Sequence, residues 1–407
     1  MLPRTISSSL KRATETFPAL ILTGPIQSGK TTLLRNLFGT THSYVSLEDP
    51  DQQQFAKIDP RGFLHRLTLP VILDEIQYIP ELLTFIKTSV DENRQPGQWV
   101  ITGSQNFVLM QNVSESLAGR AAIFSLLPLS TAEIAGFGTN SLPPDKWFET
   151  FNTFDQKTSG LVLANILLRG QYPEIASKSE IDRNFWCGSY ITTYFERDIR
   201  NLKQVGDLGQ FQSFLRLCAA RTGQILDLSG LARDIGVSHT TAKRWLSLLE
   251  TSHQIYLLYP YYKNMGKRLT KRPKLYFVDT GLATYLTGIH NPEIMLSSPY
   301  VGPLFETFVV IDILKRFYNH GLLPSMFYFR TQDKLEIDLV IEQEDRLHLI
   351  EIKSTQTVYP KFSAHLVRLK NELKDKSGTA TLFSNTEYSS EQPHGIINRS
   401  WKDTLIT

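Results

Sequence analysis

A glycine-framed segment, GPIQSGKT at residues 24–31, constrains the fold of this chain more than any other feature. It follows an apolar run, ALILTG, and it opens a segment, GKTTLLRNLF, whose apolar residues recur at helical spacing. A strand, a tight loop and a helix are therefore predicted in that order. The segment is a complete G-x-x-x-x-G-K-[ST] pattern, which is typical of a phosphate-binding loop at the start of a helix. We expect an α/β domain with a parallel sheet around it.

Each position of this loop has an expected role toward ATP and Mg²⁺. Gly24 and Gly29 let the backbone bend around phosphate oxygens, and the backbone amides face the anion. Lys30 neutralises the β- and γ-phosphates, and the Thr31 hydroxyl completes the Mg²⁺ shell. The loop residues expected to contact the nucleotide are Gly24, Pro25, Gln27, Ser28, Gly29, Lys30, Thr31 and Thr32.

Two more predicted strands bring polar side chains to the same edge of the sheet. VILDE at 71–75 runs apolar into two carboxylates, as a buried strand does where it ends at a ligand crevice. Asp74 is expected to hold Mg²⁺ through water, and Glu75 to orient or deprotonate the attacking water. After WVIT at 99–102, either Thr102 or Ser104 is placed to reach the γ-phosphate. A plain turn is the alternative there.

The composition limits the class of protein. A chain of 407 residues is expected to form roughly two to four domains. Cys187 and Cys218 have no CxxC or Cys/His pattern around them, so a reducing cytoplasmic location without zinc knuckle or disulfide is expected. The apolar run at 17–22 is too short to span a membrane. A net charge of +3 is too small to indicate nucleic acid by itself.

Several segments of the first 135 residues occur together in a known order: LTGPIQSGKTTLL, VSLEDPDQQQ, DPRGFL, VILDEIQ, VITGSQN and SLAGR. In this set the chain resembles a family of prokaryotic AAA-type ATPases. GQYPE and YFERDIRNL, farther along, resemble hallmarks of a conserved second region of that family, whose function is largely unassigned. Ile26 departs from the family, which often has Arg there. The resemblance implies Arg120 as a γ-phosphate sensor, with Arg197 and Arg200 as weaker candidates; surface or interdomain ion pairs are the alternative.

The middle of the chain carries a helix-turn-helix pattern after a loop-rich stretch at 136–160. Residues 228–249 place Ala232, Gly236, Ala242 and Trp245 at the small, turn and packing positions of such a motif. Ser238, His239, Thr240, Lys243, Arg244 and Ser247 are then left to face outward, as a polar and basic surface that suits a DNA groove.

The stretch that follows, residues 251–278, contains no Asp or Glu, and tyrosines alternate with its basic residues Lys263, Lys267, Arg268, Lys271, Arg272 and Lys274. It is typical of the wing of a winged helix that contacts phosphates, which predicts salt-dependent binding. The alternative is that this module packs against the ATPase or another protein. The residues predicted to bind nucleic acid are Lys243, Arg244, Lys267, Arg268, Lys271 and Arg272.

The last part of the chain contains a carboxylate on an apolar helix face. The helix is predicted over 303–317, with Glu306 on its apolar stripe, so this group requires a partner. Partner candidates lie on two strands, LEIDLVI at 335–341 and LHLIEIK at 347–353, joined by a turn through Glu344 and Asp345. Centring the hairpin on that turn places Asp338 opposite Glu351 and Glu336 opposite Lys353 on one face. A divalent cation would relieve the repulsion between the first pair.

The D-x₁₂-E-I-K spacing resembles the core of the restriction-endonuclease-like nucleases over residues 300–385. The resemblance implies that Asp338 and Glu351 bind Mg²⁺, that Lys353 activates water or steadies the phosphate, and that Glu306 assists. The alternative is an ordinary strand with a surface ion pair.

The sequence thus predicts an AAA-type P-loop domain over 1–135, a helical connector over 136–220, a winged helix-turn-helix over 221–290 and a restriction-endonuclease-like α/β domain over 295–407. The favoured function is ATP-dependent action on DNA, with Mg²⁺ as cofactor. One alternative is an ATP-controlled switch that docks protein or DNA without cutting it. Another is an oligomeric remodelling motor, which needs an arginine from a neighbouring subunit; the sequence leaves the oligomeric state open.

Overall fold

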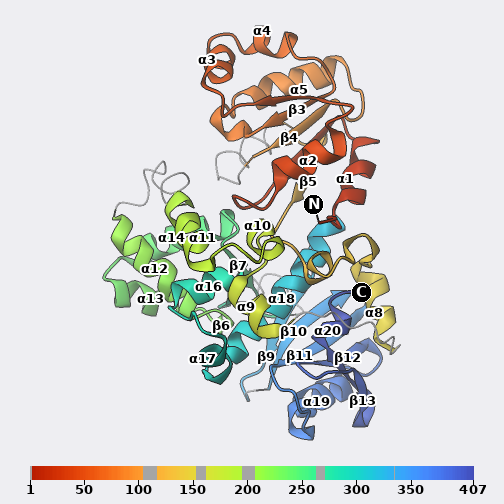
Figure 1. Ribbon diagram of the computed structural model, residues 1–407. Coiled ribbons are helices and arrows are strands. Elements are labelled where there is room, and N and C mark those ends of the chain that lie inside the picture. The colour runs from red at the N-terminus through yellow and green to blue at the C-terminus, as the bar shows by residue number, and fades with distance from the viewer. Residues whose placement is uncertain (1, 104–116, 153–161, 195–206, 263–270, 334) are drawn as a thin grey trace.

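The computed structural model describes residues 2–103, 117–152, 162–194, 207–262, 271–333 and 335–407. Figure 1 shows the N-terminal sheet domain at one end, with the helices of the middle region and the C-terminal sheet at the other. Within these ranges, no helix has both the length and the apolar character needed to cross a membrane.

The N-terminal domain is built on a parallel sheet of five strands. Alternate residues of β1 (Ala19–Thr23), an inner strand, enter two different cores: Ala19 and Ile21 face one side, and Leu20 and Leu22 face the other. This is why the strand is apolar at every position rather than at every second one. The strand order is β2 (Ser43–Ser46), β3 (Val71–Asp74), β4 (Trp99–Thr102), β1 (Ala19–Thr23) and β5 (Ala121–Ser125).

Helices cover both faces of this sheet. α1 (Ser7–Thr14) and α2 (Lys30–Phe38) pack on one side, and α3 (Pro50–Ile58), α4 (Pro60–His65) and α5 (Leu82–Glu92) pack on the other. Local signals set where two of them begin: the Asp49 and Asp59 side chains each accept a backbone N–H at a helix start, with proline at the first position.

The middle region contains the predicted helix-turn-helix. α13 (Leu228–Ile235) ends at Gly236, which takes the left-handed conformation with φ 78°, and α14 (His239–Thr251) starts at the Ser238 cap. Ala232, Ala242 and Trp245 are buried at the predicted packing positions. Beside them lies an antiparallel sheet in the order β6 (Gln224–Ile225), β8 (Lys274–Phe277), β7 (Ile255–Leu258).

The described residues of the connector at 136–220 share their core with other parts of the chain. One continuous apolar cluster includes Ile26 and then residues from Leu127 to Leu405, among them residues of the connector, of α13 and α14 and of the C-terminal sheet. The helices of the middle region, besides the two above, are α7 (Thr131–Ile134), α8 (Pro144–Glu149), α9 (Leu163–Arg169), α10 (Pro173–Ser177), α11 (Arg183–Tyr194), α12 (Leu208–Ala220), α16 (Thr280–Leu286) and α17 (Pro292–Ser297).

The C-terminal sheet has six strands among the described residues, and its hairpin of residues 336–353 has the predicted register: Leu339 pairs with Ile350 and Gln343 with Arg346. α18 (Val301–Asn319) packs on one face and α19 (Ala364–Leu373) on the other. The strand order is β13 (Ser390–Gln392), β14 (Ile396–Ser400), β12 (Ser377–Ser384), β11 (Arg346–Lys353), β10 (Glu336–Gln343) and β9 (Met326–Arg330), and a short helix, α20 (Trp401–Thr404), follows.

The C-terminal half of α18 joins the two ends of the molecule through buried polar contacts. Asp312 accepts hydrogen bonds from the backbone N–H and the hydroxyl of Thr131, at 2.7 and 2.8 Å. The Lys315 Nζ donates to the Leu129 carbonyl at 3.0 Å and to the Gln171 side-chain oxygen at 2.6 Å. The segment that leaves β5 is thereby fixed to a helix of the C-terminal unit.

Replacing Asp312 by alanine is expected to destabilise the protein strongly. Burial lowers the pKa of Lys315 to about 8, against the opposing charges of Asp312, Asp279 and Glu133, and the substitution removes the largest of these charges. Breaking a buried charge pair costs about 3–5 kcal/mol, and urea unfolding followed by circular dichroism measures it. Asp375→Ala, at an exposed position, is the control. Equal unfolding midpoints for the two variants would contradict the expectation.

Candidate nucleotide site and carboxylate cluster

The backbone of the predicted phosphate loop requires both of its glycines. Gly24 has φ 141°, and a Cβ at this position would lie 2.2 Å from the Leu126 carbonyl oxygen. Gly29 has φ 92° and directly precedes α2. Side chains rarely adopt these values, so the loop can take this path only with glycine at both points.

The loop places Lys30 and Thr31 at the carboxyl edge of the sheet. The buried Lys30 Nζ donates to the carbonyls of Gly24 and Pro25, at 3.0 Å each. The Thr31 Oγ1 donates to Asp74 at the end of β3, at 2.9 and 3.1 Å from its two carboxylate oxygens. Residues 43 positions apart in sequence, Thr31 and Asp74, are thus in direct contact, as a shared Mg²⁺ shell requires.

Two further side chains hold the carboxylate of Asp74. The Tyr44 hydroxyl donates to it at 2.7 Å, and burial together with the Asp74 charge raises the pKa of Tyr44 to about 12. The Thr102 hydroxyl also donates to Asp74 and accepts the backbone N–H of Glu75 at 3.1 Å. Thr102 therefore lies within the site, whereas Ser104 lies outside the described residues. Tyr44 carried no sequence signal, because it lies on a neighbouring strand without a motif.

The catalytic candidate Glu75 follows β3 in a left-handed conformation, with φ 60°. Its carboxylate accepts a hydrogen bond from the Gln77 amide, and its backbone is fixed by Thr102. The hydroxyl of Thr31 and the carboxylate of Asp74 are hard oxygen ligands of the kind that Mg²⁺ prefers. The residues present therefore fit a magnesium ion at this edge.

Arg4 is a member of the site that the sequence did not indicate. Its buried guanidinium donates to the Ser28 carbonyl at 3.0 Å and to the Leu127 carbonyl at 2.7 Å, and pairs with Glu133 at 3.1 Å. Glu133 also completes a capping box with Ser130 at the start of α7. The phosphate loop is thereby tied to the segment that leads into the middle region.

Arg120 does not lie beside the phosphate loop of its own chain. Its backbone carbonyl accepts the N–H of Ala19 at the start of β1, whereas Gly24 follows the other end of that strand. Its side chain pairs with Asp91, at 2.5 and 2.9 Å. The ion pair given as the alternative is present, and the role of Arg120 as a γ-phosphate sensor stays a prediction. Arg197 and Arg200 lie outside the described residues.

A cavity of about 400 Å³ opens beside the phosphate loop and is shared with the middle region. A Cβ placed on Gly29 would lie 3.7 Å from Pro173 Cγ, so the GQYPE segment covers the loop. The cavity is lined by Leu2, Arg4, Gln27, Gly29, Thr32, Leu129, Pro173, Glu174, Ser177 and Lys178.

The predicted basic surface of the middle region is only partly described. Lys243 and Arg244 are exposed on α14, and Lys271 and Arg272 are exposed just before β8. Lys263, Lys267 and Arg268 lie outside the described residues. Lys274, which the sequence placed in the same basic stretch, is instead buried, with its side chain 4% exposed. It therefore belongs to a different site.

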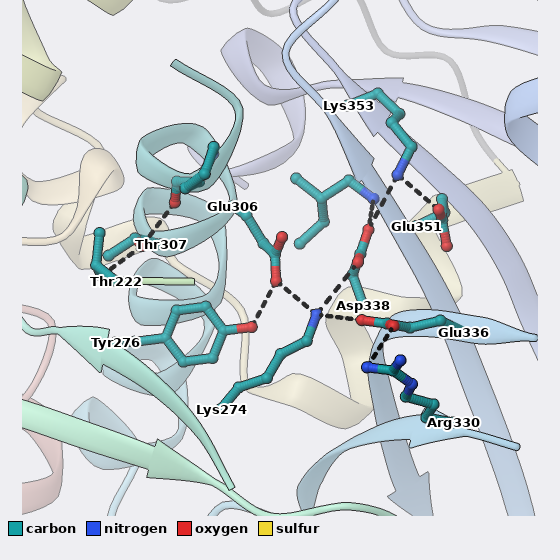
Figure 2. A network of polar contacts seen from close by, with 12 residues as sticks. Thr222, Lys274, Tyr276, Glu306, Thr307, Arg330, Glu336, Asp338, Glu351 and Lys353 are labelled. Atoms are coloured by element: carbon teal, nitrogen blue, oxygen red, sulfur yellow. Dashed lines mark hydrogen bonds and ion pairs between the residues drawn. The ribbon is translucent and has the colours of Figure 1, made fainter. Parts of the chain in front are cut away.

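Lys274 is the centre of a cluster with three carboxylates (Figure 2). Its Nζ lies 3.0 Å from Glu306, 2.9 Å from Glu336 and 3.4 Å from Asp338. The Tyr276 hydroxyl donates to the same Glu306 oxygen at 2.6 Å. Glu306 does have the partner that its place on an apolar helix face requires. That partner comes from β8 and not from the β10–β11 hairpin, where it was expected.

A second lysine closes the other side of the cluster. The Lys353 Nζ lies 2.6 Å from Glu351 and 3.3 Å from the Oδ2 atom of Asp338, which also accepts the backbone N–H of Ile352 at 2.9 Å. Asp338, Glu351 and Lys353 are thus together, as the hairpin predicted. Glu336, which the predicted register places opposite Lys353, forms its ion pairs with Lys274 and Arg330.

The carboxylates of the cluster differ in the direction in which their pKa is shifted. Burial, reinforced by the charge of Asp338, raises the pKa of Glu306 to about 7 and that of Glu351 to about 8. Asp338 is also buried, but Lys274 and Lys353 outweigh the burial and lower its pKa. Asp338 is therefore the ionised member, and the two glutamates take up protons close to neutral pH.

Both carboxylates of the predicted metal pair contact lysines. The two oxygens of Asp338 contact ammonium or backbone N–H groups, and Glu351 contacts Lys353. The Glu351 Oε2 atom is buried and has no hydrogen-bond partner among the described residues. Positive charge beside this pair thus comes from Lys274 and Lys353, and the Mg²⁺ site at Asp338 and Glu351 stays a prediction.

Comparison with known proteins agrees with the N-terminal site. Residues 16–135 match a family model described as an AAA domain, which confirms the predicted AAA-type P-loop domain. Residues 162–293 and 301–400 each match a model described as a domain of unknown function, DUF8612 and DUF4143. "Uncharacterized protein Rv2008c" of Mycobacterium tuberculosis is 31% identical over 356 residues, 87% of this chain and 74% of that protein.

More distant similarities include "Uncharacterized protein MJ1544" of Methanocaldococcus jannaschii, 23% identical over 82% of this chain and 74% of that protein. Among solved structures, the Walker-type ATPase PABY2304 of Pyrococcus abyssi is 16% identical with a TM-score of 0.45, covering 70% of this chain and 96% of that chain. The RuvB Holliday junction branch migration motor of Thermotoga maritima has a TM-score of 0.30 at 16% identity, covering 62% and 86%.

The carboxylate cluster makes stability depend on pH in a specific way. Because the pKa of Glu351 in the folded protein, about 8, lies above its ordinary value of 4.5, this group favours folding at low pH. That contribution is lost as the pH rises toward and through 8. Relative to the wild type, Glu351→Gln should become steadily more stable between about pH 4.5 and 8, measured by urea unfolding at each pH. Glu391→Gln, on an exposed edge-strand residue, is the control; the same trend in both variants would contradict the assignment.

Proposed function

This chain belongs to the family that includes the mycobacterial protein Rv2008c, and we propose that its N-terminal domain hydrolyses ATP with Mg²⁺. The observation that carries the proposal is the convergence of Thr31, Asp74, Glu75 and Thr102 at one edge of the sheet, beside the loop that holds Lys30. A phosphate loop with a hydroxyl and a carboxylate in contact is the arrangement that nucleotide hydrolysis uses.

The roles of the residues follow from their contacts. Lys30 exchanges the carbonyls of Gly24 and Pro25 for the β- and γ-phosphate oxygens. Thr31 and Asp74 would hold Mg²⁺, whose bound charge neutralises the phosphates. Glu75 orients a water molecule and accepts its proton as the oxygen attacks the γ-phosphorus. The bond between the γ-phosphorus and the bridging oxygen breaks, and ADP leaves.

Substitutions at Lys30 and Glu75 test these roles separately. Lys30→Ala removes the phosphate contact and should abolish both nucleotide binding and turnover. Glu75→Gln keeps the shape of the side chain but not its basicity, so binding should persist while turnover falls by about 10² or more. Phosphate release and binding of a fluorescent ATP analogue measure the two effects, with Lys57→Ala, at an exposed position of the same domain, as control. Wild-type turnover retained in Glu75→Gln would refute the role of Glu75.

As a second function we propose that the middle region binds DNA under the control of ATP. The exposed basic residues Lys243 and Arg244 of α14 and Lys271 and Arg272 before β8 support it, because such side chains neutralise backbone phosphates. Cleavage of the DNA at Asp338, Glu351 and Lys353 stays a prediction from the sequence. The pairing of these carboxylates with two lysines favours binding without cutting.

Salt dependence tests the DNA proposal. When binding is measured by the anisotropy of a labelled duplex, the logarithm of the binding constant should fall linearly with the logarithm of the salt concentration. Lys271→Glu combined with Arg272→Glu should reduce the size of that slope by about 1–2. As a control, Lys374→Glu with Lys376→Glu makes the same charge change at exposed positions of the C-terminal region. This double variant should leave the slope unchanged. Salt-insensitive binding in the wild type would point to protein docking instead. Metal-dependent plasmid nicking that Asp338→Ala abolishes would show a nuclease.

A further inference from the structure

The cavity next to the phosphate loop can hold the part of a nucleotide that lies beyond its phosphates. Once the phosphates occupy the loop at Lys30 and Thr31, the nucleoside needs space that borders the same loop. The cavity borders it at Gln27, Gly29 and Thr32, and its volume of about 400 Å³ falls within the range of about 300–1,000 Å³ that is usual for small-molecule sites. The cavity therefore has the place and the size that a nucleoside requires.

The wall of this cavity that faces away from the AAA domain carries a carboxylate. Glu174 of the GQYPE segment is the second residue of α10 and lines the cavity, next to the apolar surface of Pro173. Its side chain is 48% exposed, so a ligand in the cavity can reach it. A carboxylate accepts hydrogen bonds and donates none. The ligand group that contacts Glu174 is therefore a hydrogen-bond donor.

Neighbouring side chains fix the position of this carboxylate. The Trp186 indole Nε1 donates to the Glu174 Oε2 atom at 3.2 Å, and the Lys178 Nζ lies 3.5 Å from Oε1. Each carboxylate oxygen can accept more than one hydrogen bond, so these contacts orient the group and leave it able to accept a donor from a ligand. An oriented acceptor of this kind is how a largely apolar pocket selects one ligand among similar ones.

The segment that carries the carboxylate is also connected to the rest of the middle region and to α18. The Gln171 side chain donates to Asp312 at 3.2 Å. The Tyr172 hydroxyl contacts the Tyr190 hydroxyl at 2.7 Å, and Gln254, just before β7, donates to the same hydroxyl at 3.1 Å. A ligand that contacts the GQYPE segment is thus linked through side chains to α18 and to residues 253–258.

We propose that Glu174 is a specificity-determining residue, which accepts a hydrogen bond from the nucleoside of the ATP or ADP held at Lys30. The inference rests on the proposed ATPase function and extends it to recognition of the nucleoside. Adenosine offers donors of two kinds, the ribose hydroxyls and the amine of the base. Because Glu174 belongs to the middle region, either donor gives the nucleotide a direct contact outside the AAA domain.

Nucleotide affinity, measured by calorimetry in the presence of Mg²⁺, tests this contact. Glu174→Ala should weaken binding of ADP by about 10- to 100-fold, the range for a hydrogen bond to a charged group. Tripolyphosphate has phosphates but no nucleoside, so it should bind Glu174→Ala no more weakly than the wild type. Glu180→Ala, at an exposed position six residues later, is the control and should leave both affinities unchanged.

Analogues of ADP identify the donor, and they keep the inference testable if Glu174→Ala fails to fold. In the wild type, 2′-deoxy-ADP or 3′-deoxy-ADP should bind more weakly than ADP if the ribose supplies the donor. Purine riboside diphosphate, which lacks the amine, should bind more weakly if the base supplies it. In folded Glu174→Ala, the affected analogue should bind as ADP does, because the acceptor for the missing donor is gone.

Three results would overturn the inference. The first is unchanged ADP affinity in folded Glu174→Ala, and the second is full affinity of the wild type for all three analogues. The third is an equal loss of affinity for ADP and tripolyphosphate in Glu174→Ala, which would place the effect of the carboxylate at the phosphates. Wild-type protein that binds neither ADP nor tripolyphosphate would refute the proposed ATPase function instead.

Discussion

The arrangement of this molecule depends on charged groups that are buried along α18. Asp312 and Lys315 are buried, and among the described residues their side chains form hydrogen bonds with segments far away in sequence. Buried charges are tolerated only when they are paired, so Thr131, Gln171 and the helix have a single compatible arrangement. The exit of the AAA sheet, the GQYPE segment and the C-terminal unit are thereby fixed to one another.

The same helix carries Glu306 in its N-terminal half, where it contacts Lys274 and Tyr276 of β8. α18 is one helix, and it therefore links the junction with the AAA domain to the carboxylate cluster. Lys274 then joins the small middle sheet to β10 of the C-terminal sheet. A displacement of the AAA domain transmitted through Asp312 would reach both sheets, as the proposed control by nucleotide requires.

The parts that the sequence predicted correctly are those set by local pattern. The GPIQSGKT loop requires glycine at two backbone positions, and β1, β3 and β4 are buried at every position. The register of Leu339 with Ile350 follows from the turn at Glu344 and from alternation along two strands. Lys274 was misassigned because its neighbours in sequence are basic, whereas its environment is set by residues 32 to 64 positions later. Arg4 and Tyr44 were missed for the same reason, since their partners lie far along the chain.

The central claim is that the nucleotide at the phosphate loop is sensed outside the AAA domain. Hydrogen exchange of the Glu75→Gln variant, with and without ATP and Mg²⁺, tests it most directly, because exchange reports local opening segment by segment. We expect slower exchange on nucleotide binding in residues 30–38, in residues 253–258 and in α18. Protection confined to residues 16–135, with residues 253–258 and α18 unchanged, would contradict it.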